Sequence, residues 1–343
     1  MKALRKRGAE PGLSIVEVPR PGAPCAGEVL IAVEAAGICG SDVHVYEWTS
    51  GYEWMRAALP LTLGHEFAGR VVEVGEGVSE PVPGDLVTVQ PTASCSACAA
   101  CRRGHPDLCT AKRTLGLTRD GAFAPLVTAP AASCFRLPSG VDAELGALTE
   151  PLCVAAHALE VGGLRLGHSV VVLGAGTIGQ AIALLAKRAG AAPVILAGLD
   201  DAPRLAAARD LGIEHTVDLA AEDLEAAVTR IAGGKVEMVL EATGVPVSIR
   251  DGLGILQRRG VLVTTGIHAE PVAFDLTGLV RNQHQIRGSH ASTRRDFETV
   301  VRLLGEEGDR LRAMITHRLP LEDGVRGFEL SRQRSALKVM LRP

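Results

Sequence analysis

The segment 169–190, SVVVLGAGTIGQAIALLAKRAG, constrains the fold of this chain more than any other feature. It contains an apolar strand, a glycine turn and a helical pattern, and Gly174, Gly176 and Gly179 have the spacing G-x-G-x-x-G. In this context the first glycine allows a tight turn, the second lets the backbone approach a pyrophosphate, and the third lets helix and strand pack closely. The helix N-terminus then presents free N–H groups to phosphates. We predict a dinucleotide site here; the alternative is a plain connecting turn.

Apolar strands and helical patterns continue to alternate after this turn. PVILAGL is followed by APRLAAARDLG, and the pattern goes on through TVDL, EDLEAAVTRIAG, VEMVLEATG and GVLVTTGI. Such alternation is typical of βαβ units, which build a parallel sheet. This half of the chain is therefore predicted to be an α/β domain.

The first 150 or so residues have a different character. The β-branched runs EVLIAVEAAGI, AGRVVEVG and DLVTVQ are separated by closely spaced glycine and proline, which predicts a small barrel or sandwich. A helical pattern, RRDFETVVRLLGEE, begins near residue 291 and leads into the C-terminal segment. A length of 343 residues suits two such domains.

Charge and hydropathy exclude several classes of function. The net charge is −3, so there is no basic field to attract nucleic acid or an anionic membrane. No apolar run approaches the ~18 residues of a membrane span, and MKALRKRGAE is not followed by an apolar run of the kind found in secretory signals. We expect a soluble, cytoplasmic protein whose cysteines are thiols or metal ligands.

The residue that usually fixes the ribose of NAD is missing. An acidic side chain is expected about 20 positions after the glycine turn, and Gly198 occupies that place. Asp200 and Asp201 follow at once, with Arg204 after them. A 2′-phosphate would meet two acids and one base, so the sequence favours NAD over NADP. The alternative for either aspartate is a cap on the following helix.

Four of the eight cysteines lie in one stretch, residues 95–109, CSACAACRRGHPDLC. Four thiolates fill the tetrahedral shell of zinc and leave no position for a substrate, which is typical of a structural site. Reduced thiols on a loop are one alternative. A nucleic-acid-binding zinc module is another, but no basic stripe surrounds the stretch.

Three shorter segments offer candidate ligands for a catalytic metal. They are GICGSDVH at 37–44, GHEFAG at 64–69 and TEPLC at 149–153. A catalytic zinc needs about three protein ligands and an open position, and Cys39, His65 and one glutamate would satisfy this. Taken alone, Cys39 could equally be core packing and His65 part of a surface pair.

These motifs occur together in one order along the chain. With VVLGAGTIGQ and ITHRLPLEDGVRGFE, they resemble the zinc-dependent medium-chain alcohol dehydrogenases over nearly the whole chain, and most closely the polyol (sorbitol-type) and threonine dehydrogenases. The resemblance implies a GroES-like β-barrel catalytic domain over residues 1–153, to which 291–343 return. It also implies a Rossmann doubly wound parallel-sheet cofactor domain over 154–290.

The resemblance also implies a role for individual residues. The implied catalytic zinc ligands are Cys39, His65, Glu66 and Glu150, with the two glutamates exchanging during turnover. Ser41 matches the proton-relay hydroxyl, His44 the outlet of the relay, and Asp42 a group that orients His65. The implied structural zinc ligands are Cys95, Cys98, Cys101 and Cys109. The predicted cofactor contacts are Gly174, Gly176, Thr177, Ile178, Gly179, Gly198, Asp200, Arg204, Thr243, Gly266 and Ile267.

The substrate is not fixed by these motifs. The stretch GSHASTRRD lacks the Arg-Tyr pair with which sorbitol-type enzymes contact the polyol, and EPLCVAAH and VQPTASC replace the features of threonine dehydrogenases. Residues 45–63 contain both tryptophans and both tyrosines of the chain. We predict that they line part of the substrate pocket; the alternative is hydrophobic contact within the barrel domain.

The predicted reaction is reversible oxidation of a secondary alcohol to a ketone, with hydride transfer to NAD and with NADP as the other possible acceptor. Two zinc ions per chain are implied, one catalytic and one structural. A zinc-free enone or quinone reductase on the same fold is one alternative, and a cofactor-binding protein without turnover is another. The resemblance suggests a homo-oligomer, a tetramer rather than a dimer, with a small alcohol or ketone as the other partner.

Overall fold

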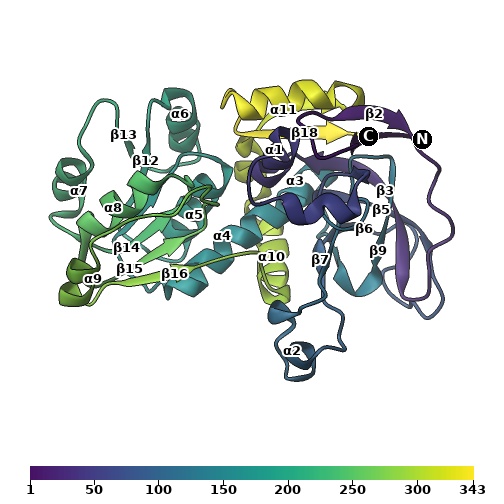
Figure 1. Ribbon diagram of the computed structural model, residues 1–343, viewed down its shortest axis with the longest axis horizontal. Coiled ribbons are helices and arrows are strands. Elements are labelled where there is room, and N and C mark those ends of the chain that lie inside the picture. The colour runs from purple at the N-terminus through teal and green to yellow at the C-terminus, as the bar shows by residue number, and fades with distance from the viewer. The chain divides into compact units, whose positions relative to one another are not determined.

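The computed structural model describes residues 1–343, except for the side chain of Asp107. The chain divides into two compact units, Met1–Glu150 with Thr293–Pro343, and Pro151–Ser292. Both ends of the chain belong to the first unit, whose ribbon is purple to teal and yellow in Figure 1. The sequence prediction placed the domain boundaries after residues 153 and 290, and these boundaries stay a prediction. Among the described residues, no helix combines the length and the apolar character needed to cross a membrane.

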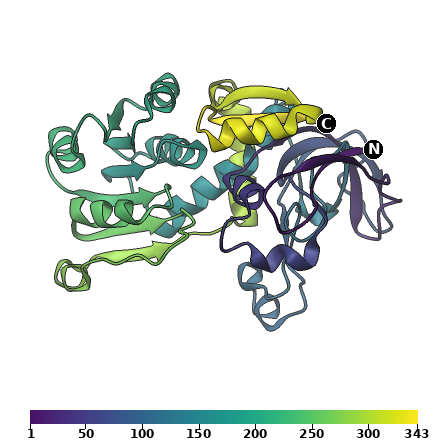
Figure 2. The same cartoon turned by 45° about the horizontal axis from the view of Figure 1, so that its top comes forward.

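The first unit is built mainly from β-strands (Figures 1 and 2). Its largest sheet has the order β10-β6-β5-β3-β18-β17, with β9 also paired to β3. The C-terminal strand β18 pairs antiparallel with β3, so the last segment of the chain completes a sheet begun near the first. The strands are β3 Glu28–Gly37, β5 Glu66–Val74, β6 Leu86–Val89, β9 Leu126–Pro130, β10 Cys134–Arg136, β17 Ile315–Pro320 and β18 Lys338–Arg342.

Two smaller sheets and five α-helices complete this unit. One sheet has the order β2-β1-β4 and the other pairs β7 with β8. Their strands are β1 Lys2–Lys6, β2 Ser14–Glu17, β4 Leu61–Thr62, β7 Thr92–Ala93 and β8 Arg113–Thr114. The α-helices are α1 Gly40–Glu47, α2 Ala99–Arg102, α3 Ala143–Ala147, α10 Arg294–Leu311 and α11 Gly324–Arg332. Short 3-10 helices are η1 Glu53–Ala58, η2 Pro106–Leu108, η3 Ala131–Ser133, η4 Arg312–Met314 and η5 Leu321–Asp323.

The second unit is a six-stranded parallel sheet with the order β13-β12-β11-β14-β15-β16. The strand order reverses between β11 and β14, and in such sheets ligands bind outside the carboxyl ends of the strands at this point. The strands are β11 Val170–Leu173, β12 Val194–Gly198, β13 His215–Asp218, β14 Val236–Glu241, β15 Leu256–Thr264 and β16 Gln285–Gly288. The helices are α4 Thr149–Gly162, which begins in the first unit, α5 Thr177–Arg188, α6 Ala202–Asp210, α7 Leu224–Ala232, α8 Pro246–Ile255 and α9 Leu276–Asn282.

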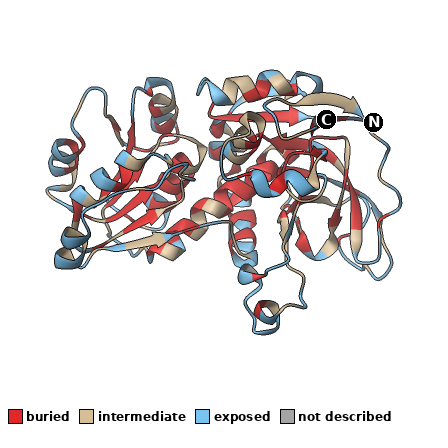
Figure 3. Cartoon of the chain, viewed as in Figure 1, coloured by how far each residue is buried: buried red, intermediate tan, exposed pale blue. Residues whose placement is uncertain are grey.

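The parallel-sheet prediction is confirmed, and burial explains why the sequence reveals it (Figure 3). All four residues of β11 and all five of β12 are buried, as expected for central strands covered on both faces. Strand β16 was not predicted from the sequence. Its four residues, QIRG, are exposed or half-buried at the sheet edge, so they carry no apolar signal.

Candidate functional site

Helix α1, which carries three of the predicted site residues, is fixed at both ends. At its start, the carboxylate of Asp42 accepts a hydrogen bond of 3.1 Å from the backbone N–H of Cys39. At its end, Trp48 adopts the left-handed conformation, and the buried Lys6 lies 5.2 Å from the centre of the indole. The Lys6 ammonium also donates to the carbonyl of Tyr46 at 3.2 Å. These contacts hold α1 against the rest of the first unit.

His65, directly before β5, is buried beside α1. Its Nδ1 lies 3.5 Å from Oδ1 of Asp42, and its Nε2 lies 3.4 Å from Oγ of Ser41. Burial lowers the pKa of His65, but the charges of Asp42 and Cys39 outweigh it and raise that pKa well above its usual range. Asp42 and Ser41 thus contact opposite ring nitrogens of His65, and the orienting role of Asp42 stays a prediction.

Glu66 has a partner that the sequence did not predict. The ammonium of Lys338, on β18, donates to Oε2 of Glu66 at 2.5 Å and to the carbonyl of Ile38 at 3.0 Å, and both charged side chains are buried. Gly37 leaves the room for this pair, because a Cβ there would lie 2.4 Å from Oε2 of Glu66. The other carboxylate oxygen, Oε1, is buried without a hydrogen-bond partner. The sequence feature that could have indicated this buried ion pair is the lone lysine in the apolar run ALKVMLRP.

Glu150 lies in the first turn of α4 and is also buried. Burial is the main cause that raises its pKa to about 7; Glu66 and Asp42 act in the same direction, while His65 and Lys338 oppose it. This carboxyl group therefore belongs to the same electrostatic environment as the other predicted ligands of the catalytic metal.

The side chains of Cys39, His65, Glu66 and Glu150 are of the kinds that bind zinc, but the structure does not bring their ligand atoms close together. Among the described residues, no three of the ligand atoms of Cys39, His65, Glu66 and Glu150 lie within 4.8 Å of one another. The oxygen Oε1 of Glu66 is buried without a hydrogen-bond partner, and the carboxyl group of Glu150 is buried near it in the same electrostatic environment. One sulfur, one imidazole nitrogen and carboxylate oxygens fit Zn²⁺ with an open position.

His44 lies on the same helix as Ser41 but has different partners. Its Nδ1 is 3.1 Å from the hydroxyl of Thr49, and its ring stacks on Tyr52 at a centroid distance of 5.8 Å. Burial, with the negative charges of Cys39 and Asp42, raises the pKa of Tyr52 to about 12. The contact with Thr49 occupies Nδ1 of His44, so Nε2 is its other ring nitrogen.

The aromatic segment 45–63 serves mainly as core packing. Tyr52 is buried in the hydrophobic core of the first unit, and Tyr46 and Trp48 pack against that core. Trp54 alone of the four aromatic side chains is mostly exposed, with 55% of its surface accessible. Three of the four aromatic side chains of this segment therefore make hydrophobic contacts within the unit, as the alternative interpretation of the sequence held. Only Trp54 has enough exposed surface for the predicted contact with a substrate.

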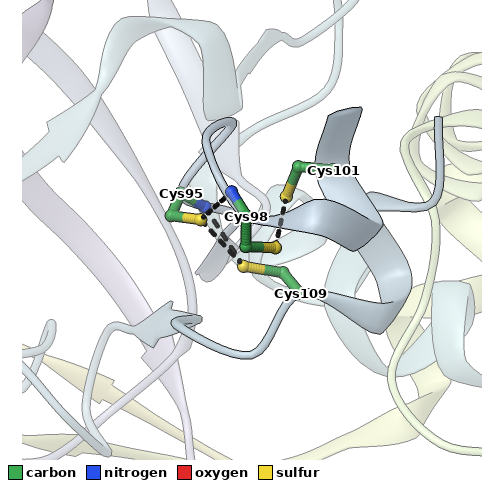
Figure 4. Close-up of side chains that lie close together, drawn as sticks. All are labelled: Cys95, Cys98, Cys101 and Cys109. Carbon is green, nitrogen blue, oxygen red and sulfur yellow. Dashed lines mark hydrogen bonds between the residues drawn. The ribbon is translucent and has the colours of Figure 1, made fainter. Parts of the chain in front are cut away.

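The four clustered cysteines converge in a separate lobe of the first unit (Figure 4). Their sulfur atoms all lie within 4.8 Å of one another, although they come from a loop, helix α2 and the residue after η2. The Cys98 and Cys101 sulfurs are 3.5 Å apart, as are those of Cys95 and Cys109. This packing of four soft donors fits a closed tetrahedral metal shell.

The backbone of the lobe also favours thiolates. The N–H groups of Cys101 and Thr110 lower the pKa of Cys98 to about 6, and the N–H of Cys95 is the main cause that lowers the pKa of Cys109. Burial, followed by the neighbouring Cys98 and Cys109, raises the pKa of Cys101 to about 11. Four thiolates at this spacing repel one another, so the full set needs a cation between them.

The glycine turn of the second unit has the geometry that the motif requires. Gly174 has φ of 112°, which favours glycine, and it connects β11 to the start of α5. A Cβ on Gly179 would lie 1.8 Å from the carbonyl oxygen of Gly174, so this close approach of helix and turn excludes a side chain. Gly176 is the N-cap of α5, and Thr177 and Ile178 form its first turn.

Two aspartates follow strand β12, of which the first is exposed and the second is buried. Gly198, the last residue of β12, is buried. Asp200 is exposed, and its backbone N–H donates to Oδ1 of Asp218 at 2.9 Å. Asp201 stands at the N-cap of α6, but its side chain makes no capping hydrogen bond and instead accepts from Arg204. Neither the exposed Asp200 nor Asp201 therefore serves as a side-chain cap of this helix.

Glu241, which sequence reasoning missed, organises the remaining predicted cofactor residues. Its fully buried carboxylate accepts hydrogen bonds from the backbone N–H groups of Thr243 at 2.6 Å and Gly244 at 2.8 Å. The other oxygen lies 3.1 Å from Nε2 of His268 and would be 2.7 Å from a Cβ on Gly266. Thr243, Gly266 and the following Ile267 are thus brought together at the carboxyl ends of β14 and β15.

We expect Glu241→Ala to lower the free energy of unfolding by about 3 kcal/mol, because it leaves buried backbone donors without an acceptor. The distorted loop should also weaken NADH binding by about tenfold, which is about 1.4 kcal/mol. Chemical denaturation and cofactor fluorescence measure the two effects. Glu237→Gln, near the amino end of the same strand, is the control and should leave NADH affinity unchanged. Wild-type stability and affinity in the alanine variant would contradict the assigned role.

Comparisons with known proteins agree with this geometry. Residues 25–139 match the family described as Alcohol dehydrogenase GroES-like domain, and residues 177–306 match Zinc-binding dehydrogenase. The sorbitol dehydrogenase of Halalkalibacterium halodurans is 34% identical, with 100% of this chain and 99% of the relative covered. The L-threonine 3-dehydrogenase of Bacillus licheniformis is 36% identical over the same shares, 100% and 99%.

A solved structure extends the likeness to the fold. The zinc-binding dehydrogenase of Sinorhizobium meliloti 1021, bound to NADP, has a TM-score of 0.86 at 31% identity, with 100% of this chain and 99% of that chain covered. The matches span both units, and the enzyme class they share is an NAD(P)-dependent oxidoreductase acting on alcohols. The chain therefore belongs to the zinc-dependent medium-chain alcohol dehydrogenase family, in its sorbitol and threonine dehydrogenase branch.

Proposed function

We propose that the protein oxidises a secondary alcohol reversibly to a ketone, with zinc in the first unit and NAD on the second. The observation that carries this proposal is the group of the half-buried Cys39 with the buried His65 and two buried glutamates, with Ser41 within 3.4 Å of the imidazole of His65. The first unit is assigned to catalysis and the second to cofactor binding. A polyol, a sugar alcohol or a hydroxy amino acid is the proposed substrate class, because the relatives above are sorbitol and threonine dehydrogenases.

In this proposal the catalytic zinc is held by Cys39, His65 and one glutamate, Glu66 or Glu150. Bound zinc supplies Lewis-acid polarisation of the substrate hydroxyl. Asp42 orients His65, and Lys338 competes with the metal for Glu66, which leaves Glu150 available as the other carboxylate ligand.

The proton chemistry falls to two side chains of α1. Ser41 Oγ would accept the hydroxyl proton of the substrate while its own proton passes on towards His44, since Ser41 lies next to the imidazole of a proposed metal ligand. His44, whose Nδ1 is fixed by Thr49, releases a proton to solvent from Nε2. The glycine turn and the loops fixed by Glu241 position the nicotinamide cofactor.

The lobe of four cysteines supports the proposal against a zinc-free reductase. We propose that it holds a second, structural zinc, so that the protein contains about two zinc atoms per chain. By resemblance to its branch we also propose a cytoplasmic homo-oligomer, with a tetramer favoured over a dimer.

One experiment separates this function from its alternatives. The purified protein is incubated with NAD and a panel of polyols, 2,3-diols and hydroxy amino acids, and the absorbance of NADH is followed while zinc is measured on the same sample. We expect turnover of at least one secondary alcohol and about two zinc atoms per chain. Turnover of enones without metal would support the reductase, and cofactor binding without any turnover would support a non-catalytic protein.

A further inference from the structure

Lys6, the last residue of β1, has no exposed surface, although a lysine is seldom buried completely unless its charge is compensated. Its compensation comes from the backbone. The ammonium group has three N–H donors, and it donates to the carbonyls of Glu10, Gly12 and Tyr46, the last two at 3.3 and 3.2 Å. Because there is a carbonyl acceptor for each donor, the ammonium is held at one point between the N-terminal segment and the end of α1.

Lys6 contacts both the backbone and a side chain at this helix end. The carbonyl of Tyr46 is one of the last four of α1, which have no N–H partner within the helix, and it also accepts the N–H of Gly12 at 2.8 Å. The centre of the Trp48 indole lies 5.2 Å from the ammonium of Lys6 and 5.7 Å from the guanidinium of Arg56. Two cations are therefore close enough to be attracted to one aromatic ring.

The backbone of Trp48 is strained. It has φ of 56° and ψ of 49°, and the N–H of the next residue, Thr49, donates to the carbonyl of His44 at 3.1 Å, as in the Schellman motif that ends many helices. Glycine usually occupies the left-handed position of this motif, because a side chain is unfavourable there. A bulky residue keeps this conformation only where neighbouring contacts impose it, and Lys6 and Arg56 make such contacts with the indole.

The turn at Trp48 decides what His44 contacts. In a continuing α-helix the N–H of Thr49 would bond to the carbonyl of Val45, four positions back. The left-handed residue redirects this N–H to His44, and the hydroxyl of Thr49 lies 3.1 Å from Nδ1 of the same histidine. The contacts of Lys6 at the helix end are thus connected to the imidazole of His44 through Trp48 and Thr49.

We propose that Lys6 is a positioning residue for His44, because it holds the strained turn that sets Thr49 against the imidazole. The inference rests on the proposed function, in which His44 releases the substrate proton to solvent. Lys6 itself exchanges no proton in this role, since its three donors are used by carbonyl groups. Its contribution is to keep His44 in the orientation that proton release requires.

The test replaces Lys6 by methionine, which keeps the length of the side chain and removes the ammonium. With the alcohol identified by the panel above, kcat should fall by about tenfold while KM stays within about twofold. Raising the concentration of a non-chelating buffer, a morpholine sulfonate, at constant pH and ionic strength should restore most of the lost kcat, because the buffer can take the proton that a displaced His44 does not. A loss of stability alone would not respond to buffer.

A second measurement does not depend on turnover. The rate at which diethyl pyrocarbonate modifies His44, followed by peptide mass spectrometry, should rise by about threefold in Lys6→Met, because Nδ1 loses its contact with Thr49. The exposed His105 serves as the internal reference and should react at the wild-type rate. If Lys6→Met does not fold, Trp48→Leu removes the ring that Lys6 contacts and should give the same changes.

Lys2→Met is the matched control, because Lys2 lies on the same strand in an exposed ion pair with Glu322. It should leave kcat and the reactivity of His44 unchanged. Combining Lys6→Met with His44→Gln should lower kcat no further than His44→Gln alone, since both changes act on one step.

Wild-type His44 reactivity in Lys6→Met, or a loss of kcat that buffer does not restore and that adds to the loss in His44→Gln, would overturn the inference and leave the proposed reaction intact. Absence of alcohol turnover in wild type would instead refute the proposed function. In that case a raised reactivity of His44 in Lys6→Met would still support the positioning of the imidazole by Lys6.

Discussion

Replacing Cys39 by alanine is expected to abolish alcohol oxidation while leaving NADH binding nearly intact. The substitution removes the sulfur ligand of the proposed catalytic zinc, and kcat should fall by about a thousandfold or more. The proposed cofactor contacts lie in the second unit, whereas Cys39 belongs to the first. Steady-state kinetics, cofactor fluorescence and zinc content on the same preparation measure the three quantities.

Cys25→Ala is the control for this experiment, because Cys25 is an exposed thiol of the same unit outside the proposed sites. It should retain wild-type kcat and zinc content. The assignment of Cys39 would be wrong if its alanine variant lost NADH affinity but kept turnover. Loss of one zinc together with loss of kcat would support it.

Replacing Cys98 by alanine is expected to affect stability more than chemistry. Cys98 has two backbone donors that favour its thiolate and a sulfur contact with Cys101, so its removal opens the proposed closed metal shell. We expect a loss of about 3 kcal/mol in the free energy of unfolding and a fall in Tm of roughly 10 °C. Zinc content should drop by about one atom per chain, while kcat of the remaining folded enzyme should stay within about threefold of wild type.

Differential scanning calorimetry and metal analysis test this result, again with Cys25→Ala as the control. A variant with normal Tm and a sharply lower kcat would contradict the structural role of the lobe. Together the two cysteine substitutions distinguish the proposed catalytic zinc from the proposed structural zinc. The Cys39 variant should lose alcohol oxidation, and the Cys98 variant should lose stability.

The sequence was sufficient to predict the features that are encoded locally. The glycine turn, the alternating strands and helices and the cysteine spacing each depend on residues close together in the chain, and the parallel sheet and the cysteine cluster appear where they were predicted. His65 and Asp42 are 23 positions apart, and their contact was expected through the family resemblance rather than from spacing.

The features that were missed depend on contacts between distant segments. Lys338 reaches Glu66 across 272 positions of sequence, because β18 is paired with β3 and β3 with β5. The sequence does not mark Glu241 as a buried, structurally important residue, because an acidic residue at the end of an apolar strand can equally face solvent. The difference between Asp200 and Asp201 is a matter of backbone direction: Asp200 has φ of 50° and is exposed, while Asp201 turns inward.

The pairing of β18 with β3 has a consequence for biosynthesis. The second unit is continuous in sequence, so all of its strands have been made before β18 leaves the ribosome. The first unit is interrupted, and its largest sheet gains β17 and β18 after the whole second unit has been translated. Because domains fold as units during synthesis, the nucleotide-binding half can fold first. Glu66 then receives its buried lysine partner last, so the environment of the proposed catalytic zinc is among the final parts of the enzyme to mature.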